Sequence, residues 1–171
     1  MYRTNKGFSI RTWQKGDEAY LAKSANNYNI WKNLRNIFPY PYTYDDATTW
    51  IELNINKKKP TSFALVLNED PIGNIGFILG LDVHSKNIEI GYWLCEDYWG
   101  QGFVSSAVQW LCEYIVENHN PHRIWASVFE SNIGSIKVLE KNGFKHEATI
   151  VENIFKENVF LDEHIYSKII K

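Results

Sequence analysis

The change of hydrophobic period along the chain constrains its fold more than any other feature of the sequence. Three consecutive segments, Ser62–Leu67, residues 72–79 and Asn87–Leu94, have the alternating or short apolar pattern of β-strands, and turn residues separate them. A helical pattern follows at residues 103–118, and another strand pattern at Arg123–Phe129. A meander of strands followed by strand–helix–strand crossovers predicts an α/β domain with a mixed sheet.

Turn residues, caps and shorter patterns define the remaining elements. We expect strands at residues 8–13, 144–149 and 159–170, and helices at residues 17–26, 28–36, 46–56 and 132–141. Prolines at positions 39 and 41 exclude a helix from segment 38–46, and Thr43 or Asp45 is expected to cap the helix after it. Since no repeat, low-complexity tract or linker interrupts the chain, residues 1–171 are expected to form a single domain.

Composition excludes several classes of protein. With 44% hydrophobic and 22% charged residues, the chain can bury a core of its own, which excludes disorder as its main state. Its net charge of −2 supplies no basic field, so no nucleic-acid partner is expected. No apolar run approaches the roughly 18 residues of a transmembrane helix, and the N-terminus has no apolar signal region. A cytoplasmic protein without a membrane partner is therefore predicted.

The cysteines and histidines do not have the pattern of a metal site. The two cysteines, Cys95 and Cys112, lack zinc-ligand spacing, and in a cytoplasmic protein they are expected to be reduced, buried thiols. The five histidines form no ligand set, since His119 and His122 flank a proline turn and are expected at the surface. No metal cofactor is predicted.

Two glycines between a strand and a helix form the most informative motif, in Tyr-Trp-Gly-Gln-Gly-Phe-Val-Ser-Ser at residues 98–106. Such a turn can expose backbone N–H groups at the positive end of a helix, where a phosphate or pyrophosphate binds. A Walker loop is excluded because no Gly-Lys-Ser/Thr sequence is present. A dinucleotide fingerprint fits Gly100 and Gly102 but has Ser105 at the third glycine position, and a glycine-rich turn without a ligand is the remaining alternative.

The strand before this turn carries a carboxylate on one face. Alternation separates two sets of side chains, Ile88, Ile90, Tyr92 and Leu94 on one face and Glu89, Gly91 and Trp93 on the other. Burying a carboxylate costs several kcal/mol unless it is paired or solvated. Glu89 is therefore a candidate functional residue.

Three motifs occur in order along the second half of the chain: Glu-Ile-Gly-Tyr-Trp-Leu from residue 89, Tyr-Trp-Gly-Gln-Gly-Phe from residue 98, and Asn-x-x-Ser from residue 132 with a later Gly-Phe. Together they resemble the GNAT superfamily of N-acetyltransferases, and within it the ribosomal-protein branch of RimJ and RimL. The resemblance implies the acyl-CoA N-acyltransferase fold, with a central mixed, mostly antiparallel sheet of six to seven strands and helices on both faces. It also implies direct transfer of acetyl from acetyl-CoA to a primary amine, either a protein N-terminus or a small molecule.

The resemblance also implies cofactor-binding residues. Five consecutive residues would offer backbone N–H groups to the pyrophosphate of acetyl-CoA: Gln101, Gly102, Phe103, Val104 and Ser105. Trp99 and Val104 depart from the family motif Arg/Gln-x-x-Gly-x-Gly/Ala, but backbone donors do the binding. Tyr92, Trp93 and Leu94 would pair with the pantetheine, and an N–H near Leu94 would polarise the thioester carbonyl. Asn132 matches an asparagine that contacts the cofactor, and it fits a helix N-cap equally well.

Two residues are expected to carry the chemistry. Glu89 matches a strand position that serves as general base in some family members, and the alternative is that it only binds the acceptor's ammonium. Many members protonate the leaving thiolate with a tyrosine, but that position is Leu139 here, so the resemblance assigns the acid to Ser135. The alternative for Ser135 is a serine that satisfies N–H groups in the first turn of a helix.

Other functions stay open from the sequence. They are a non-catalytic acyl-CoA-binding module, a transferase for a different acyl-CoA, and a nucleotide-cofactor protein that uses Gly100 and Gly102. The aromatic side chains of residues 28–50 either line the acceptor site or pack the early helices on the sheet. The expected partners are acetyl-CoA and an amine acceptor, and the expected state is a monomer or a homodimer.

Overall fold

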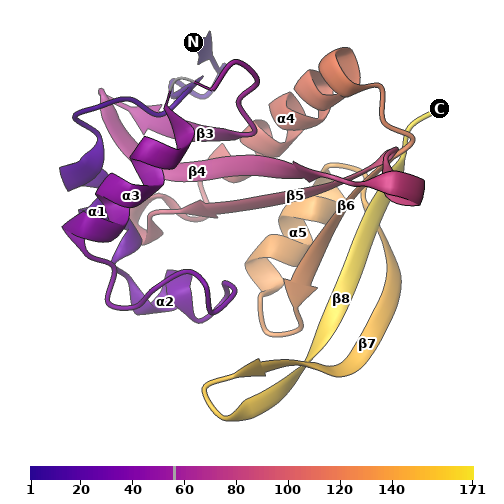
Figure 1. The fold of residues 1–171 in the computed structure, drawn as a ribbon. Helices are drawn as coiled ribbons and strands as arrows, with labels where there is room; N and C mark the ends of the chain where they lie inside the picture. Colours follow the sequence, from indigo (N-terminus) through magenta and orange to yellow (C-terminus); the bar gives the residue numbers. More distant parts are fainter. Residues whose placement is uncertain (56) are drawn as a thin grey trace. The chain divides into compact units, whose positions relative to one another are not determined.

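Eight strands form one mixed sheet, in the order β1-β2-β3-β4-β5-β6-β8-β7, in the computed structural model (Figure 1). The model describes residues 1–55 and 57–171. The strands are β1 (Tyr2–Arg3), β2 (Ser9–Arg11), β3 (Ser62–Leu67), β4 (Asp70–Leu79), β5 (Asn87–Leu94), β6 (Arg123–Phe129), β7 (Lys145–Lys156) and β8 (Val159–Ile169). The α/β fold is confirmed. The expected six to seven strands is wrong because β1, with only two residues, is too short to show a pattern.

Five α-helices accompany the described strands: α1 (Glu18–Ala25), α2 (Tyr28–Trp31), α3 (Tyr44–Asn54), α4 (Phe103–His119) and α5 (Ile133–Lys141). The chain forms two compact units, one of Met1–Gly76 with Tyr92–Ala107 and the other of Phe77–Gly91 with Val108–Lys171. Among the described helices, none combines the length and the apolar character that crossing a membrane requires.

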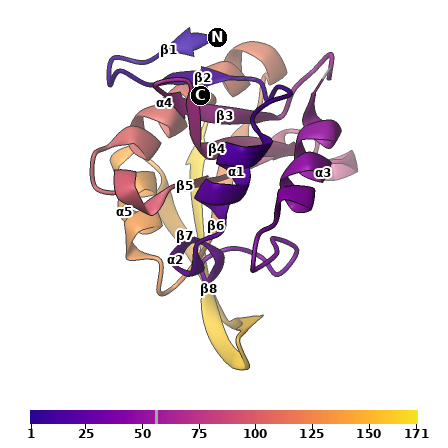
Figure 2. The ribbon, with the colours of Figure 1, turned by 90° about the vertical axis from the view of Figure 1, so that its left-hand side faces the viewer.

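The first unit contains an antiparallel ladder of β1, β2, β3 and the beginning of β4, and Figure 2 shows these strands side by side. Asn68 and Glu69 connect β3 to β4 with φ of 50° and 75°. Two consecutive positive φ values define the tight turn that matches the twist of an antiparallel hairpin. Asp70 and Pro71, expected in the turn, belong to β4 instead.

Helices α1 and α3 cover a buried apolar cluster of the first unit. Its members are Trp13, Leu21, Ala25, Tyr42, Ala47, Ile51, Ala64 and Val66. Thr43, rather than Asp45, caps α3, because its hydroxyl accepts from the Asp46 N–H while the Asp46 carboxylate accepts from the Thr43 N–H. The Thr43 hydroxyl and the Thr43 N–H both donate to the Asp46 carboxylate, and these two hydrogen bonds lower the pKa of Asp46.

Two predicted helices differ from the observed ones. The helix expected at residues 28–36 is wrong beyond Trp31, because the next N–H groups, those of Asn33 and Leu34, bond three residues back to Ile30 and Trp31. The helix expected at residues 46–56 begins two residues earlier, at Tyr44, and ends at Asn54. Its predicted last residue, Asn56, lies outside the described residues.

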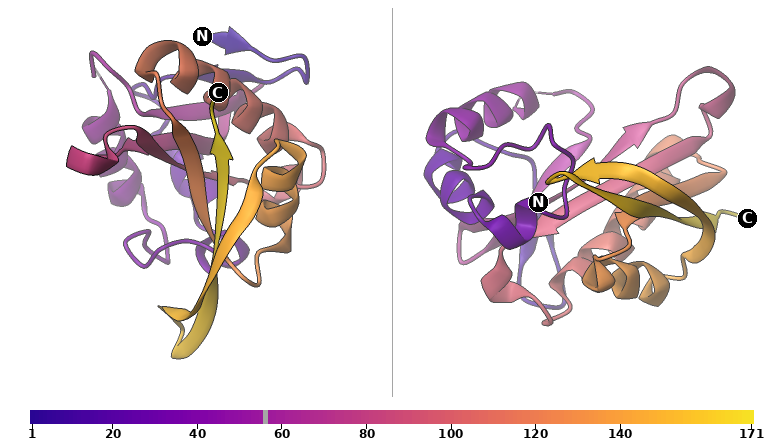
Figure 3. Two further views of the ribbon diagram at one scale, coloured as in Figure 1. Left: turned by 90° about the vertical axis from the view of Figure 1, so that its right-hand side faces the viewer. Right: turned by 90° about the horizontal axis from the view of Figure 1, so that it is seen from below.

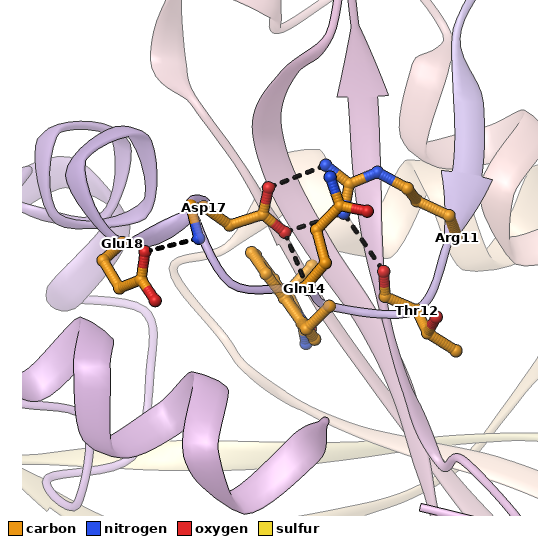
Figure 4. Close-up of polar contacts among 8 residues, drawn as sticks. Arg11, Thr12, Gln14, Asp17 and Glu18 are labelled. Atoms are coloured by element: carbon orange, nitrogen blue, oxygen red, sulfur yellow. Dashed lines mark hydrogen bonds and ion pairs between the residues drawn. The ribbon is translucent and has the colours of Figure 1, made fainter. Parts of the chain in front are cut away.

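A buried ion pair joins β2 to the start of α1 (Figure 4). Both guanidinium ends of Arg11 bond the Asp17 carboxylate at 2.7 Å, and Asp17 also accepts from the Gln14 N–H at 3.1 Å. Only 9% of Arg11 and 3% of Asp17 is exposed. Asp17 occupies the N-cap position, as expected for a helix start, but its side chain bonds Arg11 rather than a helix N–H.

The second unit contains both parallel and antiparallel pairs of strands. β5 runs parallel to β6 and pairs with it from Asn87 opposite Arg123 to Glu89 opposite Trp125. β6 then pairs with β8 along its whole length, and β8 pairs with β7. Alternate residues of β5 and β6 are buried, as are the apolar side chains of the two helices that contribute to this unit: Val108, Leu111, Ile115 and Leu139.

The hairpin of β7 and β8 extends past the end of β6 (Figure 3). β7 extends seven residues past its predicted end at residue 149, since it continues to Lys156. Between Ile150 and Ile154 the pairing is interrupted by a bulge in which Glu152 has a φ of 51°. Because β7 contains a bulge and is mostly exposed, its sequence lacks the alternation of apolar and polar residues that predicts a strand.

We predict that Asp17→Ala lowers the free energy of unfolding by about 3 to 5 kcal/mol, because Arg11 would stay buried without its partner. Urea unfolding measures the loss. The control is Glu18→Ala in the same turn, where a carboxylate bonds only the Gly16 N–H, and it should cost less than about 1 kcal/mol. Equal losses in the two variants would refute a structural role for the pair.

Candidate functional site

The turn between β5 and α4 has a backbone conformation that glycine adopts readily. Gly100 and Gly102 have φ of 74° and 80°, and α4 begins directly afterwards at Phe103. The Gly102 carbonyl accepts from the Ser106 N–H at 3.1 Å, which starts the helical hydrogen bonding. Because the first N–H groups of a helix have no partner within it, this turn meets the positive end of α4.

Trp99 ties the turn to the end of β5. Its indole N–H donates to the Leu94 carbonyl at 2.8 Å, and the amide of Gln101 donates to the Asp97 carbonyl at 3.1 Å. The N–H of Cys95 donates to Ile72 on β4 at 2.7 Å. Trp99 therefore has a structural role here, although it occupies the Arg/Gln position of the motif Arg/Gln-x-x-Gly-x-Gly/Ala.

Phe103, rather than Val104, supplies the buried side chain at the start of α4. The Phe103 ring lies 5.1 Å from the buried Phe8 ring, measured between centroids. The side chain of Val104 is half-buried.

The last residues of β5 lie very close to β4. A side chain on Gly73 would place its Cβ only 2.5 Å from the Trp93 carbonyl oxygen, so only glycine allows this approach. Leu94 is buried, whereas Tyr92 and Trp93 are half-buried, and the Trp93 ring centroid lies 6.1 Å from that of Phe38. Close packing on both sides holds residues 92–94 in place.

Two asparagines hold the carboxylate that precedes the glycine turn. Asn27 donates to Glu96 at 2.8 Å and Asn29 donates at 3.0 Å. These hydrogen bonds lower the pKa of Glu96. The sequence showed no sign of this contact, because the two asparagines belong to the segment around α2, nearly 70 residues earlier.

Glu89 lies where the pairing of β5 with β6 ends. The described parallel pairs stop at Glu89 opposite Trp125, although both strands continue. Glu89 is half-buried and, two residues on, the exposed Gly91 has open space where a side chain would be. The predicted division of β5 is confirmed, since Ile88 and Ile90 are buried on the opposite face.

Asn132 and Ser135 meet at the start of α5. The Asn132 side chain accepts from the Ser135 N–H at 3.1 Å, so the predicted N-cap is confirmed. Ser135 is half-buried in the first turn, and Leu139, one turn later, is completely buried. Gly143 ends the helix with a φ of 80°, as expected.

Glu163 on β8 forms a polar network that sequence reasoning missed. Ser127 on β6 donates to one of its carboxylate oxygens, and Asn153 in the β7 bulge donates to the other at 2.6 Å. Ser127 lies two residues after Trp125, so it shares a face of the sheet with Glu89. No local sequence pattern predicts such a network, because its three members come from three different strands.

Aromatic side chains of residues 28–50 form two groups. Tyr42 is buried in the apolar cluster, and Phe38 and Trp50 pack against it. The rings of Tyr28, Trp31 and Tyr40 instead contact one another, with centroids 5.4 to 6.0 Å apart, and nearly half of Tyr28 and Tyr40 is exposed. Packing explains the first group, and the second group presents rings at the surface.

The two cysteines are free thiols in different surroundings. Cys112 is buried as expected, and burial raises its pKa to about 11. Cys95 is half-buried, so its expected burial is wrong: it follows the end of β5 and belongs to the turn. A raised pKa makes Cys112 a poor nucleophile at neutral pH.

Comparison with known proteins identifies relatives of the whole chain. Residues 8–145 match the family model described as an acetyltransferase (GNAT) domain. The uncharacterised N-acetyltransferase YnaD of Bacillus subtilis (strain 168) is 28% identical over 170 residues, which cover 98% of this chain and 96% of YnaD. The ribosomal-protein-serine acetyltransferase of Escherichia coli (strain K12) is 31% identical over 108 residues, 63% of this chain and 60% of that protein.

A solved structure shows the same fold at low sequence identity. RimL, a ribosomal L7/L12 α-N-protein acetyltransferase in complex with coenzyme A, superposes with a TM-score of 0.84. The two are 19% identical, and the match covers 98% of this chain and 96% of RimL.

We predict that Asn132→Ala lowers the free energy of unfolding by about 1 kcal/mol, because the Ser135 N–H loses its acceptor. Asn132→Ser should retain most of the stability, since serine also caps helices. Chemical denaturation measures both variants. If alanine and serine are equally stable, the capping bond contributes nothing and Asn132 needs another explanation.

Proposed function

The chain belongs to the GNAT acetyltransferase family, and on this premise we propose that residues 1–171 form one N-acetyltransferase domain that moves acetyl from acetyl-CoA to a primary amine. The observation that carries the proposal is the pair of left-handed glycines, Gly100 and Gly102, directly before α4. A pyrophosphate needs backbone N–H groups at a helix start and a backbone that it can approach closely. The start of α4 supplies the first, and the two glycines supply the second.

The proposed cofactor site consists mostly of backbone. Five residues offer N–H groups to the pyrophosphate: Gln101, Gly102, Phe103, Val104 and Ser105. Residues Tyr92, Trp93 and Leu94 bind the pantetheine through main-chain groups, and Asn132 contacts the cofactor in addition to its capping role. The likeness to RimL, whose structure contains coenzyme A, supports this choice of ligand.

The proposed reaction is direct. The acceptor nitrogen attacks the thioester carbonyl, the oxyanion is stabilised by an N–H near Leu94, and the carbon–sulfur bond breaks to release the CoA thiolate. An acyl-enzyme is not part of the proposal, since burial raises the pKa of Cys112 and so disfavours its thiolate.

Glu89 is proposed as the general base and Ser135 as the acid. An α-amino group has a pKa near 8 and a lysine near 10.4, so an amine acceptor is largely protonated at neutral pH and must lose a proton before attack. The half-buried position of Glu89 beside the open space at Gly91 supports the first role. Ser135 would return a proton to the thiolate, directly or through a water.

The acceptor is proposed to be a protein N-terminus or a small amine. Similarity to the ribosomal-protein-serine acetyltransferase supports the first class. Similarity to the spermidine N(1)-acetyltransferase of Vibrio cholerae, 23% identical over 162 residues, supports the second. A screen of peptides and polyamines distinguishes them by turnover.

Calorimetry with acetyl-CoA tests the proposed cofactor site, with NAD and ATP as controls. The wild-type protein should bind acetyl-CoA selectively. Gly102→Ala should weaken this binding strongly, because a methyl group would stand where the pyrophosphate approaches. The matched control is Gly100→Ala, which creates the same left-handed strain at a residue outside the proposed donors.

Thermal unfolding should show similar destabilisation in the two glycine variants, about 1 to 2 kcal/mol for a Cβ in the left-handed region. If the two variants differ in acetyl-CoA affinity but not in stability, the loss of affinity comes from the contact with the ligand and not from a disturbed fold. Equal affinity of both variants for acetyl-CoA would refute the assignment of Gly102.

We predict that Glu89→Gln lowers turnover at neutral pH by about 100-fold or more while acetyl-CoA affinity stays nearly unchanged. The loss of turnover in the variant should shrink as the pH rises, because more of the amine acceptor then loses its proton without a base. Steady-state rates across pH check the result. If the variant instead raises KM for the amine and keeps kcat and the pH profile, Glu89 only binds the acceptor.

A further inference from the structure

A lysine from the N-terminal hairpin lies against the glycine turn of the first unit. An ideal Cβ built on Gly102 would be 3.8 Å from both Cε and Nζ of Lys6. Lys6 belongs to the connection between β1 and β2, about 95 residues before the turn in the sequence. The contact is therefore produced by the fold and not by neighbouring positions in the chain.

The position of Lys6 follows from the packing of its hairpin. The Thr4 hydroxyl and N–H both donate to the Phe8 carbonyl, at 2.8 and 2.9 Å, which closes the connection around Gly7 with its φ of 82°. Phe8 is completely buried, and its ring packs on Phe103 in the first turn of α4. The same contact that anchors the hairpin therefore brings Lys6 to the start of the helix.

The ammonium of Lys6 makes no hydrogen bond and no ion pair with the residues that the structure describes. A positive helix end and an unpaired ammonium thus face the same glycine backbone. Two like charges from separate elements attract the same guest, an anion of high charge density.

We propose that Lys6 is an acetyl-CoA-binding residue whose ammonium contacts a phosphate oxygen of the cofactor at Gly102. This inference rests on the proposed function. The backbone N–H groups supply directional donors, and Lys6 supplies a full charge that they lack. Lys6 lies just before the residues that match the family model, which begin at residue 8.

Calorimetric titration with acetyl-CoA tests the proposal in three variants. Lys6→Gln should weaken binding by about 10-fold, the size of a charge-assisted hydrogen bond to a phosphate. Lys6→Arg should retain most of the affinity, because it keeps the charge and the donors. Lys15→Gln is the matched control, an exposed lysine of the same unit whose loss changes the net charge equally.

Salt and a shortened cofactor provide further readouts. Affinity of the wild type should fall more steeply with ionic strength than that of Lys6→Gln, because one screened attraction is gone in the variant. With 3′-dephospho-acetyl-CoA, an unchanged effect of Lys6→Gln assigns the contact to the pyrophosphate, and a lost effect assigns it to the 3′-phosphate. Both results support a phosphate contact.

Equal acetyl-CoA affinity in wild type, Lys6→Gln and Lys15→Gln would overturn the role of Lys6 while leaving the proposed function intact. Equal weakening in the two glutamine variants would also overturn it, since it would show an effect of net charge alone. Failure of the wild type to bind acetyl-CoA would refute the proposed function itself, and the role of Lys6 with it.

Discussion

The need to satisfy backbone polar groups where β5 ends and α4 begins shapes the whole region around the candidate site. A strand end leaves N–H and C=O groups without ladder partners, and a helix start leaves further N–H groups. The chain meets this need with distinct contacts: Cys95 donates to Ile72, Trp99 donates to Leu94, and Gly102 accepts from Ser106. The positive φ of Gly100 and Gly102 lets the chain turn within these bonds. The first N–H groups of the helix have no acceptor within the helix itself, so the turn meets the positive end of α4.

β5 serves two purposes through simple alternation. Its buried residues, among them Ile88 and Ile90, build the core of the second unit, while Glu89 and Gly91 lie on the opposite, half-open face. One strand can therefore hold a carboxylate near open space without weakening the core, because the two tasks use different faces.

The sequence predicted what local rules decide. The period of two separated the faces of β5, the helical period located α4, and Asn132 and Gly143 marked both ends of α5. It could not predict contacts between distant segments, such as Asn27 and Asn29 with Glu96, because no local pattern records a partner nearly 70 residues away. Asp17 shows the difference within one residue: its position at the helix start was predictable, but its pairing with buried Arg11 depended on the packing of β2 against α1.

This difference between local rules and distant contacts explains why the sequence predicts a cofactor but not a particular acceptor. Apart from Lys6, the proposed phosphate contacts use backbone N–H groups, so they require a conformation rather than particular side chains, and Trp99 and Val104 can replace the residues of the common motif. Binding of an acceptor instead depends on side chains that the fold assembles from separate elements, as it assembles Ser127, Asn153 and Glu163. Substitutions on such a surface change its charge and shape without disturbing the glycine turn. A chain of this fold can therefore keep one donor of acetyl groups while its acceptor changes, and only the assembled surface carries the information on which amine it accepts.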